Sequence, residues 1–430
     1  MMFAGVISSL IFLVSLGLIF SEKVNRTIVG FVGAGLMVGI GIALGFYSEA
    51  QALEAVDFNT LGLLLGMMIL VALLEPTGFF QFMAVWAGRI SKGKPVRLLI
   101  MLGTVTTVLS MFLDNVTTVV LIAPVTILIC EILGVNPTPY LITEALLSNT
   151  GGVATLVGDP PNIIIGSAAD LSFNDFLVNS LPIVVVVWFV ALFLLLFLMR
   201  HELAEKPKDI EAILKLSPTE ALEDRKTAKK VLLVLGLAIV LFFIAHFLHI
   251  SPSYVALSSA GLALLWVQPN MKETLEKIEW SVLIFFAALF VMVGGLESAG
   301  VLESLVHLLA QASSIPPVLF GVIIIWVVAI LSAFVDNIPI TIAMVPVIHG
   351  LGAAGMEIGP LWWALAFGAG FGGNGSIIGS TANIVVVSLS EKTRIPITSK
   401  VWTKRGLPVM LATCLVGSIL YAMAFNYFTG

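Results

Sequence analysis

Long runs of apolar residues constrain the fold of this chain more than any other feature. Two of them, Ile28 to Phe46 and Phe176 to Met199, match the roughly 20 residues that an α-helix needs to cross a bilayer. Only 11% of the 430 residues are charged, whereas a soluble domain carries about 25%. A chain with so few charges has too little polar surface to fold around one core in water. The sequence therefore predicts a polytopic α-helical membrane protein.

The first apolar run, Gly5 to Phe20, has the features of a retained membrane helix. It has no basic head and no small-residue cleavage site, and its basic residues, Lys23 and Arg26, follow it. A cleaved signal peptide has the opposite arrangement. We therefore expect this segment to be the first membrane span.

A series of polar positions recurs in the second half of the chain at a constant offset. Asp114-Asn115 recurs as Asp336-Asn337. After the deletion of one residue, GGVATLVGDPPN from Gly151 recurs as GGNGSIIGSTAN from Gly372. An ordered series of this kind predicts two structural repeats. We place them at residues 1–200 and 229–430, joined by a polar cytoplasmic linker over 201–228.

The charges of the loops distinguish two topologies. The apolar arms at 96–133 and 318–349 form either pairs of full spans or re-entrant hairpins. With hairpins, each repeat crosses the membrane five times, and all 21 Lys and Arg, including Arg26, fall on one side, as the positive-inside rule requires. An odd number of crossings turns the second repeat upside down relative to the first. Both termini then lie on the outer side.

These observations predict an all-α polytopic membrane protein with the fold of an inverted-repeat secondary transporter. It has about ten transmembrane helices, two opposed re-entrant hairpins and two broken helices, at 138–169 and 361–390. The first break carries Gly-Asp-Pro-Pro, which removes two backbone donors and cannot continue a helix. Interrupted backbone at membrane depth is stable only where it lines a cavity or is buried in protein. We therefore expect the hairpin tips and the breaks to meet at one site.

Asp114 and Asp336 are the strongest candidates for that site. An ionised carboxylate at membrane depth costs at least roughly 2.5 kcal/mol, whereas Ser or Thr would cap a helix without this cost. The alternative interpretation is that both residues only cap the returning arms. Two interpretations of Asp159 stay open, a site residue or a turn former, because its repeat mate is Ser380.

The remaining candidates are amides, hydroxyls and one glycine of the same segments. Asn162 and Asn383 are expected to cap helices as well as to approach the solute. The proton-coupling residues are expected to be Asp114, Asp336 and Asp159. The full set of expected solute-binding or ion-binding residues is Asp114, Asn115, Thr117, Thr155, Gly158, Asp159, Asn162, Asp336, Asn337, Thr341, Asn374, Ser376, Ser380, Thr381 and Asn383.

Other polar residues have weaker claims. Glu75 and Glu297 hold matching positions at helix ends and are expected at the membrane interface, and Glu144 is a candidate relay acid without a repeat mate. Cys130 and Cys414 are isolated thiols, so neither a disulfide framework nor a metal site is expected, and no cofactor is indicated. No Lys or Arg is expected at membrane depth, which disfavours a multiply charged anion. A small cation or a neutral oxyacid such as arsenous acid suits the site better.

The motifs MFLDNVTTVVLIAPVTI, FVDNIPITIAMVPVI and GGVATLVGDPPNIIIG resemble those of the ArsB/NhaD permease family of the ion transporter superfamily. That family includes arsenite efflux permeases, NhaD-type sodium/proton antiporters and the P protein, and is akin to divalent anion/sodium symporters. The resemblance implies ten spans, two opposed hairpins and an elevator or rocking movement. The symporters carry Ser-Asn-Thr at the hairpin tips, where this chain has an aspartate, so sodium-coupled carboxylate uptake is disfavoured.

These inferences predict a transporter, not an enzyme: a proton-coupled efflux permease for arsenite or antimonite in the cytoplasmic (inner) membrane. The alternative is a sodium/proton antiporter that uses the same acids, and a remote alternative is an intramembrane aspartyl protease. The expected partners are protons, the small inorganic solute and the lipid bilayer, with no nucleic acid. Two further partners stay open, a second copy of the chain and an ATPase subunit bound to the linker.

Overall fold

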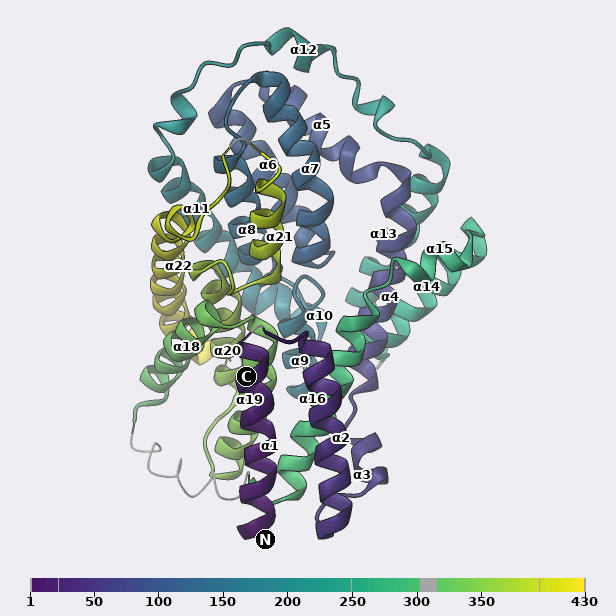
Figure 1. The fold of residues 1–430 in the computed structure, drawn as a ribbon, viewed down its shortest axis with the longest axis vertical. Coiled ribbons are helices and arrows are strands. Elements are labelled where there is room, and N and C mark those ends of the chain that lie inside the picture. The colour runs from purple at the N-terminus through teal and green to yellow at the C-terminus, as the bar shows by residue number, and fades with distance from the viewer. Residues whose placement is uncertain (1, 22, 249, 302–314, 394, 429–430) are drawn as a thin grey trace.

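The computed structural model describes residues 2–21, 23–248, 250–301, 315–393 and 395–428 (Figure 1). Helices account for the regular structure of these residues, and no strand occurs among them. In chain order the helices are α1 (Met2–Phe20), α2 (Arg26–Leu44), α3 (Glu49–Glu54), α4 (Phe58–Leu74), η1 (Glu75–Thr77), α5 (Phe79–Ser91), α6 (Pro95–Ser110), α7 (Asn115–Leu133), α8 (Thr138–Gly152), α9 (Pro160–Ala168), α10 (Phe173–Asp175), the π-helical η2 (Phe176–Ser180), α11 (Leu181–Leu198), η3 (Glu202–Ala204), α12 (Ile210–Lys215), η4 (Pro218–Glu220), α13 (Arg225–Leu248), α14 (Pro252–Val267), α15 (Met271–Glu276), α16 (Trp280–Ser298), α18 (Pro317–Phe334), α19 (Asn337–Ala353), α20 (Gly359–Gly372), η6 (Gly373–Gly375), α21 (Thr381–Ser390) and α22 (Ser399–Phe428).

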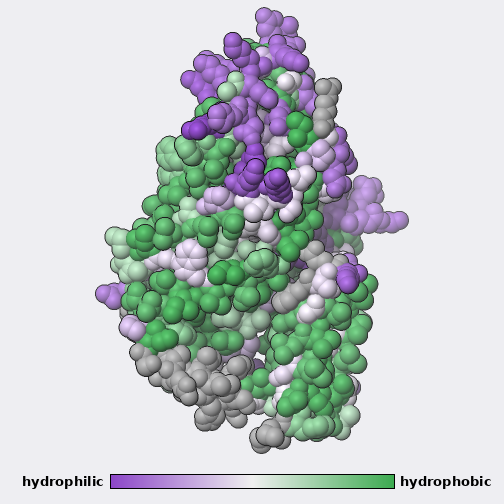
Figure 2. Space-filling view, turned by 60° about the vertical axis from the view of Figure 1, so that its left-hand side comes forward, coloured by the Kyte–Doolittle hydropathy of each residue, from purple (hydrophilic) through white to green (hydrophobic). Residues whose placement is uncertain are grey.

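The lengths and composition of these helices are those of a polytopic membrane protein. Within the described ranges, 8 helical segments are long and apolar enough to cross a bilayer, and further apolar helices of 10–17 residues accompany them. Figure 2 shows hydrophilic side chains gathered at one end of the molecule, where Figure 1 places the linker helix α12, above a largely hydrophobic face. The expected all-α fold is confirmed.

The two hairpins and the two broken helices are present. Helix α6 returns as α7 at Asp114, and α18 returns as α19 at Asp336. Between α8 and α9 the chain leaves helical geometry from Val153 to Asp159, and a second interruption separates α20 from α21. Helix α13 begins at Arg225, inside the predicted linker, whose boundaries stay a prediction.

Each interruption is closed by an asparagine amide. Asn162 Nδ2 donates to the carbonyl oxygens of Gly152, at 3.1 Å, and Thr155, at 2.8 Å. Asn383 Nδ2 donates to the carbonyl oxygens of Gly373, at 2.8 Å, and Ser376, at 2.9 Å. These asparagines stand inside the first turn of their own helix, whose N-cap residues are Asp159 and Ser380. Each amide instead caps the end of the preceding helix, where an unpaired carbonyl would be costly at membrane depth.

The breaks also need glycine, because each lies against the backbone of the neighbouring hairpin arm. A Cβ on Gly158 would lie 2.6 Å from the Gly152 carbonyl oxygen and 2.8 Å from that of Ser110. A Cβ on Gly379 would meet the Gly373 and Ser332 oxygens at the same two distances. Only a residue without a side chain permits this approach, so the positions of the break and of the hairpin arm depend on each other.

The helices of the two halves exchange partners. Helix α4 packs on α13, α14 and α15, whereas α16 packs on α1, α2 and α3. We call these two groups the scaffold bundles; α4 runs beside α14, and α16 beside α2, in Figure 1. The hairpins, the broken helices, α11 and α22 form what we call the central unit, in which α9 packs on α19 and α20, and α21 packs on α7 and α8. The exchange brings both hairpin tips and both breaks together.

Substituting Gly158→Ala or Gly379→Ala should destabilise the protein by roughly 1–3 kcal/mol, the usual cost of overpacking. The matched control is Gly17→Ala in α1, where a Cβ meets nothing within 4 Å and where alanine improves helix propensity by up to about 1 kcal/mol. Thermal unfolding of the purified protein in detergent measures both effects. Equal melting temperatures for all three variants would contradict the close approach.

Candidate functional site

A small polar cavity lies where the hairpin tips and the breaks meet. Its volume is about 50 Å³, and a single water needs roughly 10–15 Å³ on the same measure, so it has room for a few waters or one small solute. Helices α4 and α9 contribute an apolar part of the wall that includes Leu64, Met67 and Ile163. The polar wall consists of Arg26, Asp114, Asn115, Asp159, Glu279, Asp336, Asn337, Ser380 and Thr381.

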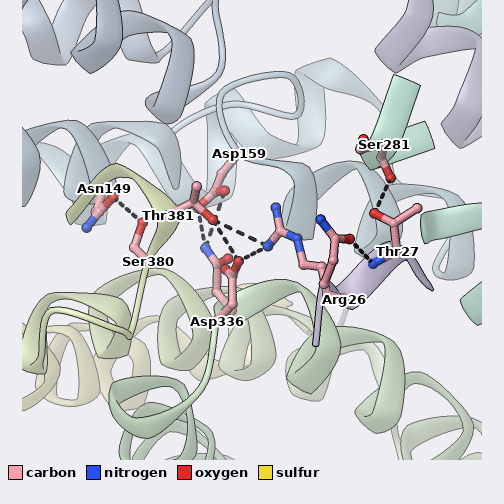
Figure 3. Close-up of polar contacts among 10 residues, drawn as sticks. Arg26, Thr27, Asn149, Asp159, Ser281, Asp336, Ser380 and Thr381 are labelled. Carbon is pink, nitrogen blue, oxygen red and sulfur yellow. Dashed lines mark hydrogen bonds and ion pairs between the residues drawn. The ribbon is translucent and has the colours of Figure 1, made fainter. Parts of the chain in front are cut away.

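Asp336 at the second hairpin tip is held by a basic residue and a hydroxyl (Figure 3). Its Oδ2 forms an ion pair with Arg26 Nη1 and accepts a hydrogen bond from Thr381 Oγ1 at 2.8 Å. Arg26 Nη1 also donates to Thr381 Oγ1 at 3.3 Å. Asp336 accepts no capping hydrogen bond from the first turn of α19. The capping interpretation therefore does not apply to this aspartate.

Arg26 lines the cavity, whereas a site without basic side chains was expected. Arg26 is the first residue of α2, which packs along α16. The guanidinium Cζ lies 5.6 Å from the centre of the Phe285 ring on α16, within the range of a cation–π interaction. The charge pattern counted Arg26 as a loop residue, since Lys23 precedes it closely. The packing of α2 on α16 instead directs its side chain into the cavity.

Asp114 at the first hairpin tip has different surroundings. Its Oδ1 accepts a hydrogen bond from the Thr117 backbone N–H at 2.8 Å, so it caps α7 while it lines the cavity. The helix of the second repeat that matches α2 is α14, which begins with Pro252 where α2 begins with Arg26. No ion pair of Asp114 occurs within the described part of the chain. The two aspartates match in sequence but differ in their contacts.

Asp159 lies in the cavity wall at the start of α9 and is 1% exposed. The amide of Asn337 donates to its Oδ2 at 3.0 Å and to its Oδ1 at 3.4 Å. Its repeat mate Ser380 also lines the cavity and donates to Asn149 Oδ1 at 3.0 Å. The wall therefore presents a carboxylate at one helix start and a hydroxyl at the other.

Asn149 is the centre of a buried amide network below the cavity. Its Oδ1 accepts from Asn115 Nδ2 at 3.1 Å and from Ser380 Oγ at 3.0 Å. Its Nδ2 donates to the side-chain oxygens of Asn374, at 3.0 Å, and Asn383, at 2.9 Å. Four bonds satisfy this amide completely. Asn149 thus joins the first hairpin tip and both broken helices.

Sequence reasoning missed Arg26, Asn149 and Glu279. The repeat alignment could not identify Asn149, because Gly370 stands at its corresponding position. It offered one signal for Glu279, whose mate is Asp57, an acid at the start of the matching helix. That signal was overlooked because both residues lie close to charged loops.

Several expected site residues lie outside the cavity wall and form hydrogen bonds with the segments that carry it. Thr155 and Ser376 donate to the backbone oxygens of Met111 and Ala333, which end the outgoing hairpin arms. Thr341 donates to the Asn337 oxygen at 2.9 Å. Thr117 lines a neighbouring cavity with Glu75, Lys277 and Glu279. The residues placed outside the cavity wall are Thr117, Thr155, Gly158, Asn162, Thr341, Asn374, Ser376 and Asn383.

Glu144 on α8 is a second buried acid outside the cavity. Its Oε1 accepts a hydrogen bond from Thr126 Oγ1 at 2.5 Å, and its Oε2 has no partner. Among the described residues, no group of three or more His, Cys, Asp or Glu side chains is placed to hold a metal ion. Cys130 and Cys414 are both buried as free thiols.

Sequence comparisons relate the chain to membrane transporters. Residues 16–368 match the family described as citrate transporter. An uncharacterized transporter of Mycobacterium tuberculosis is 41% identical over 97% of this chain and 98% of its own length. The human P protein is 32% identical over 93% of this chain and 57% of its own length.

A solved structure has the same fold. The YdaH transporter of Alcanivorax borkumensis, whose crystal structure is described as having an unusual topology, superposes with a TM-score of 0.55. The superposition covers 86% of each chain at 16% sequence identity. This likeness concerns the arrangement of the helices.

Substituting Asn149→Ala should destabilise the protein by several kcal/mol, because each buried partner left unsatisfied costs about 1–3 kcal/mol. Asn149→Asp should also destabilise it, since a carboxylate cannot donate to Asn374 and Asn383. The control is Ser259→Ala, which removes a buried hydroxyl that has no partner. Melting temperatures in detergent are the measurement, and an Asn149→Ala variant as stable as Ser259→Ala would contradict the network.

Proposed function

This chain belongs to the citrate transporter family of membrane transporters, and we propose that it exchanges protons for arsenite or antimonite across the cytoplasmic membrane. The observation that carries the proposal is the composition of the cavity wall. Three aspartates and Glu279 surround about 50 Å³ together with one guanidinium, which already pairs with Asp336. A wall of this kind suits protons and a small solute without negative charge.

The same wall argues against citrate as the solute. Three carboxylates on one molecule need several cations or helix ends to compensate them, and the four acidic side chains add repulsion. The cavity is also small for a solute of that size. We therefore do not transfer the name of the family to the substrate of this chain.

Arsenous acid is an uncharged trihydroxy compound that both donates and accepts hydrogen bonds. The carboxylates of Asp114 and Asp159 accept, while the nitrogens of Arg26 other than Nη1, which contacts Asp336, donate. No thiol lines this cavity, so binding would rest on hydrogen bonds. Protons on Asp114, Asp336 or Asp159 would replace the departing solute.

One neighbouring cavity supports an access route from the linker side. The cavity that contains Glu75 and the Lys277 ammonium, which lie 3.2 Å apart, shares Met68, Val71 and Glu279 with the central cavity. It lies next to the linker, where the Asp224 N–H donates to the Thr77 oxygen at 3.3 Å. The positive-inside rule places the linker in the cytoplasm. We therefore propose that this conformation admits solute from the cytoplasm.

A second candidate function, sodium/proton antiport, is favoured by the excess of acids. Of the four carboxylates in the wall, only Asp336 has an ion pair within the described part of the chain. A sodium ion would compensate the negative charge of the other three. The same carboxylates would then bind either sodium or protons.

Everted membrane vesicles that contain the protein distinguish the two candidates. We expect an inside-acid proton gradient to drive accumulation of arsenite or antimonite, and the uptake to stop when the gradient is collapsed. If the vesicles take up neither arsenite nor antimonite but release protons from their interior when sodium is added, the second proposal replaces the first. Vesicles without the protein are the control.

Asp114→Asn and Asp336→Asn should each reduce coupled uptake about tenfold or more. The expected loss of one charge-assisted interaction, about 1.5–3 kcal/mol, corresponds to a factor of ten or above. The control is Glu211→Gln, which neutralises an exposed acid on the linker helix α12. Full uptake by Asp336→Asn would remove this residue from the coupling mechanism.

A further inference from the structure

One ion pair joins a scaffold bundle to the central unit. The described part of the chain has three other ion pairs. One lies within the linker, one lies within a scaffold bundle, and one connects α22 to the linker. The pair of Arg26 with Asp336 connects the start of α2 with the tip between α18 and α19. These two groups move relative to each other in any elevator or rocking movement, so the pair has to break whenever the carrier changes state.

Each partner is fixed firmly to its own group. On the scaffold side, Arg26 lies over Phe285, and Thr27 Oγ1 donates to the Ser281 oxygen at 3.0 Å, which ties the start of α2 to α16 (Figure 3). On the other side, Asp336 accepts from Thr381 at the start of α21. The pair therefore connects two rigid groups and is not a contact between mobile side chains.

We propose that Arg26 couples the state of Asp336 to the movement of the central unit. While Asp336 is ionised and empty, Arg26 holds the central unit in the present position. A proton on Asp336, or a solute bound to it, removes this interaction and permits the movement. The inference rests on the proposed exchange function, because an exchanger requires that leaving an end state depends on what is bound.

The charges around Asp336 fit this role. Arg26 faces it from α2, Asp159 from the start of α9, Asp114 from the first hairpin tip, and Glu279 from the residue before α16. Among the described residues, Arg26 is the one basic side chain in this wall. Neutralising Asp336 therefore removes the charge attraction between α2 and the second hairpin tip.

The differences between the two repeats limit this interaction to one of the two end states. In an inverted-repeat transporter, the two repeats are related by a pseudo-twofold axis through the membrane, so the opposite end state is expected to bring Asp114 to the matching position. The matching helix α14 begins with Pro252 where α2 begins with Arg26, and Pro160 corresponds to Thr381. Neither proline can form an ion pair or donate a hydrogen bond to a carboxylate. The ion pair therefore stabilises only the present end state.

Distance measurements between spin labels test the proposal without any solute. One label replaces Phe31 on α2 and the other replaces Phe334 on α18; both are exposed, and both native cysteines are buried. In proteoliposomes the parent protein should show one main distance at alkaline pH. Arg26→Gln should increase the population of a second distance roughly tenfold, the shift that about 1.4 kcal/mol produces. Asp336→Asn should do the same.

Three comparisons separate this role from a general loss of structure. Arg26→Lys keeps the charge and should retain the single distance at least in part. Lys23→Gln neutralises an exposed basic residue just before α2 and is the matched control. The double variant Arg26→Gln with Asp336→Asn should resemble either single variant, because one interaction is removed in all three.

The proposal fails if Arg26→Gln and Asp336→Asn both keep the distance distribution of the parent protein. It also fails if the double variant adds the effects of the two single ones. The proposed substrate is tested separately by vesicle uptake. If the variants gain the second distance but vesicle uptake shows sodium exchange, arsenite is wrong as the solute and the role of Arg26 stands.

Discussion

The need to hydrogen-bond every backbone group at membrane depth determines the rest of this structure. Two helices are interrupted inside the protein, and each interruption leaves carbonyl groups that water cannot reach. Asn162 and Asn383 satisfy two of them each. Gly158 and Gly379 allow the same segments to lie against the hairpin arms. Because the breaks are satisfied internally, polar side chains at their edges remain available to line a cavity.

Residues that are the same in both repeats mainly build the cavity, whereas residues that differ give it its chemistry. The matched pairs Asn162 with Asn383 and Thr155 with Ser376 make equivalent bonds behind the wall. Asp159 and its mate Ser380 both line the wall. Asn149, the centre of the amide network, stands where the other repeat has Gly370. Even the matched aspartates differ, since only Asp336 has an arginine. Symmetry thus explains the fold, and its exceptions explain the site.

The same distinction explains what could be predicted from the sequence. The hairpins, the breaks and the aspartates at the tips were predictable, because apolar length, proline position and a repeated motif are all visible in the chain. Arg26 was not, since its place depends on the packing of α2 against α16. Asn149 was missed because a repeat alignment reveals only positions that match. The sequence predicted that Asn162 caps a helix, but not that its amide would cap the carbonyl end of the preceding one.

In an exchanger built from two inverted repeats, positions at which the repeats differ can make the two end states unequal. If the repeats were identical around the cavity, the two end states would have the same free energy whether or not the carrier was loaded, and occupancy could favour neither of them. A ligand shifts such an equilibrium only through its different affinity for the two states. In the coupling that we propose, one arginine on one scaffold bundle makes the ionised, empty site prefer one end state, and protonation or solute binding cancels that preference. A single unmatched charge would then be enough to make the movement depend on occupancy.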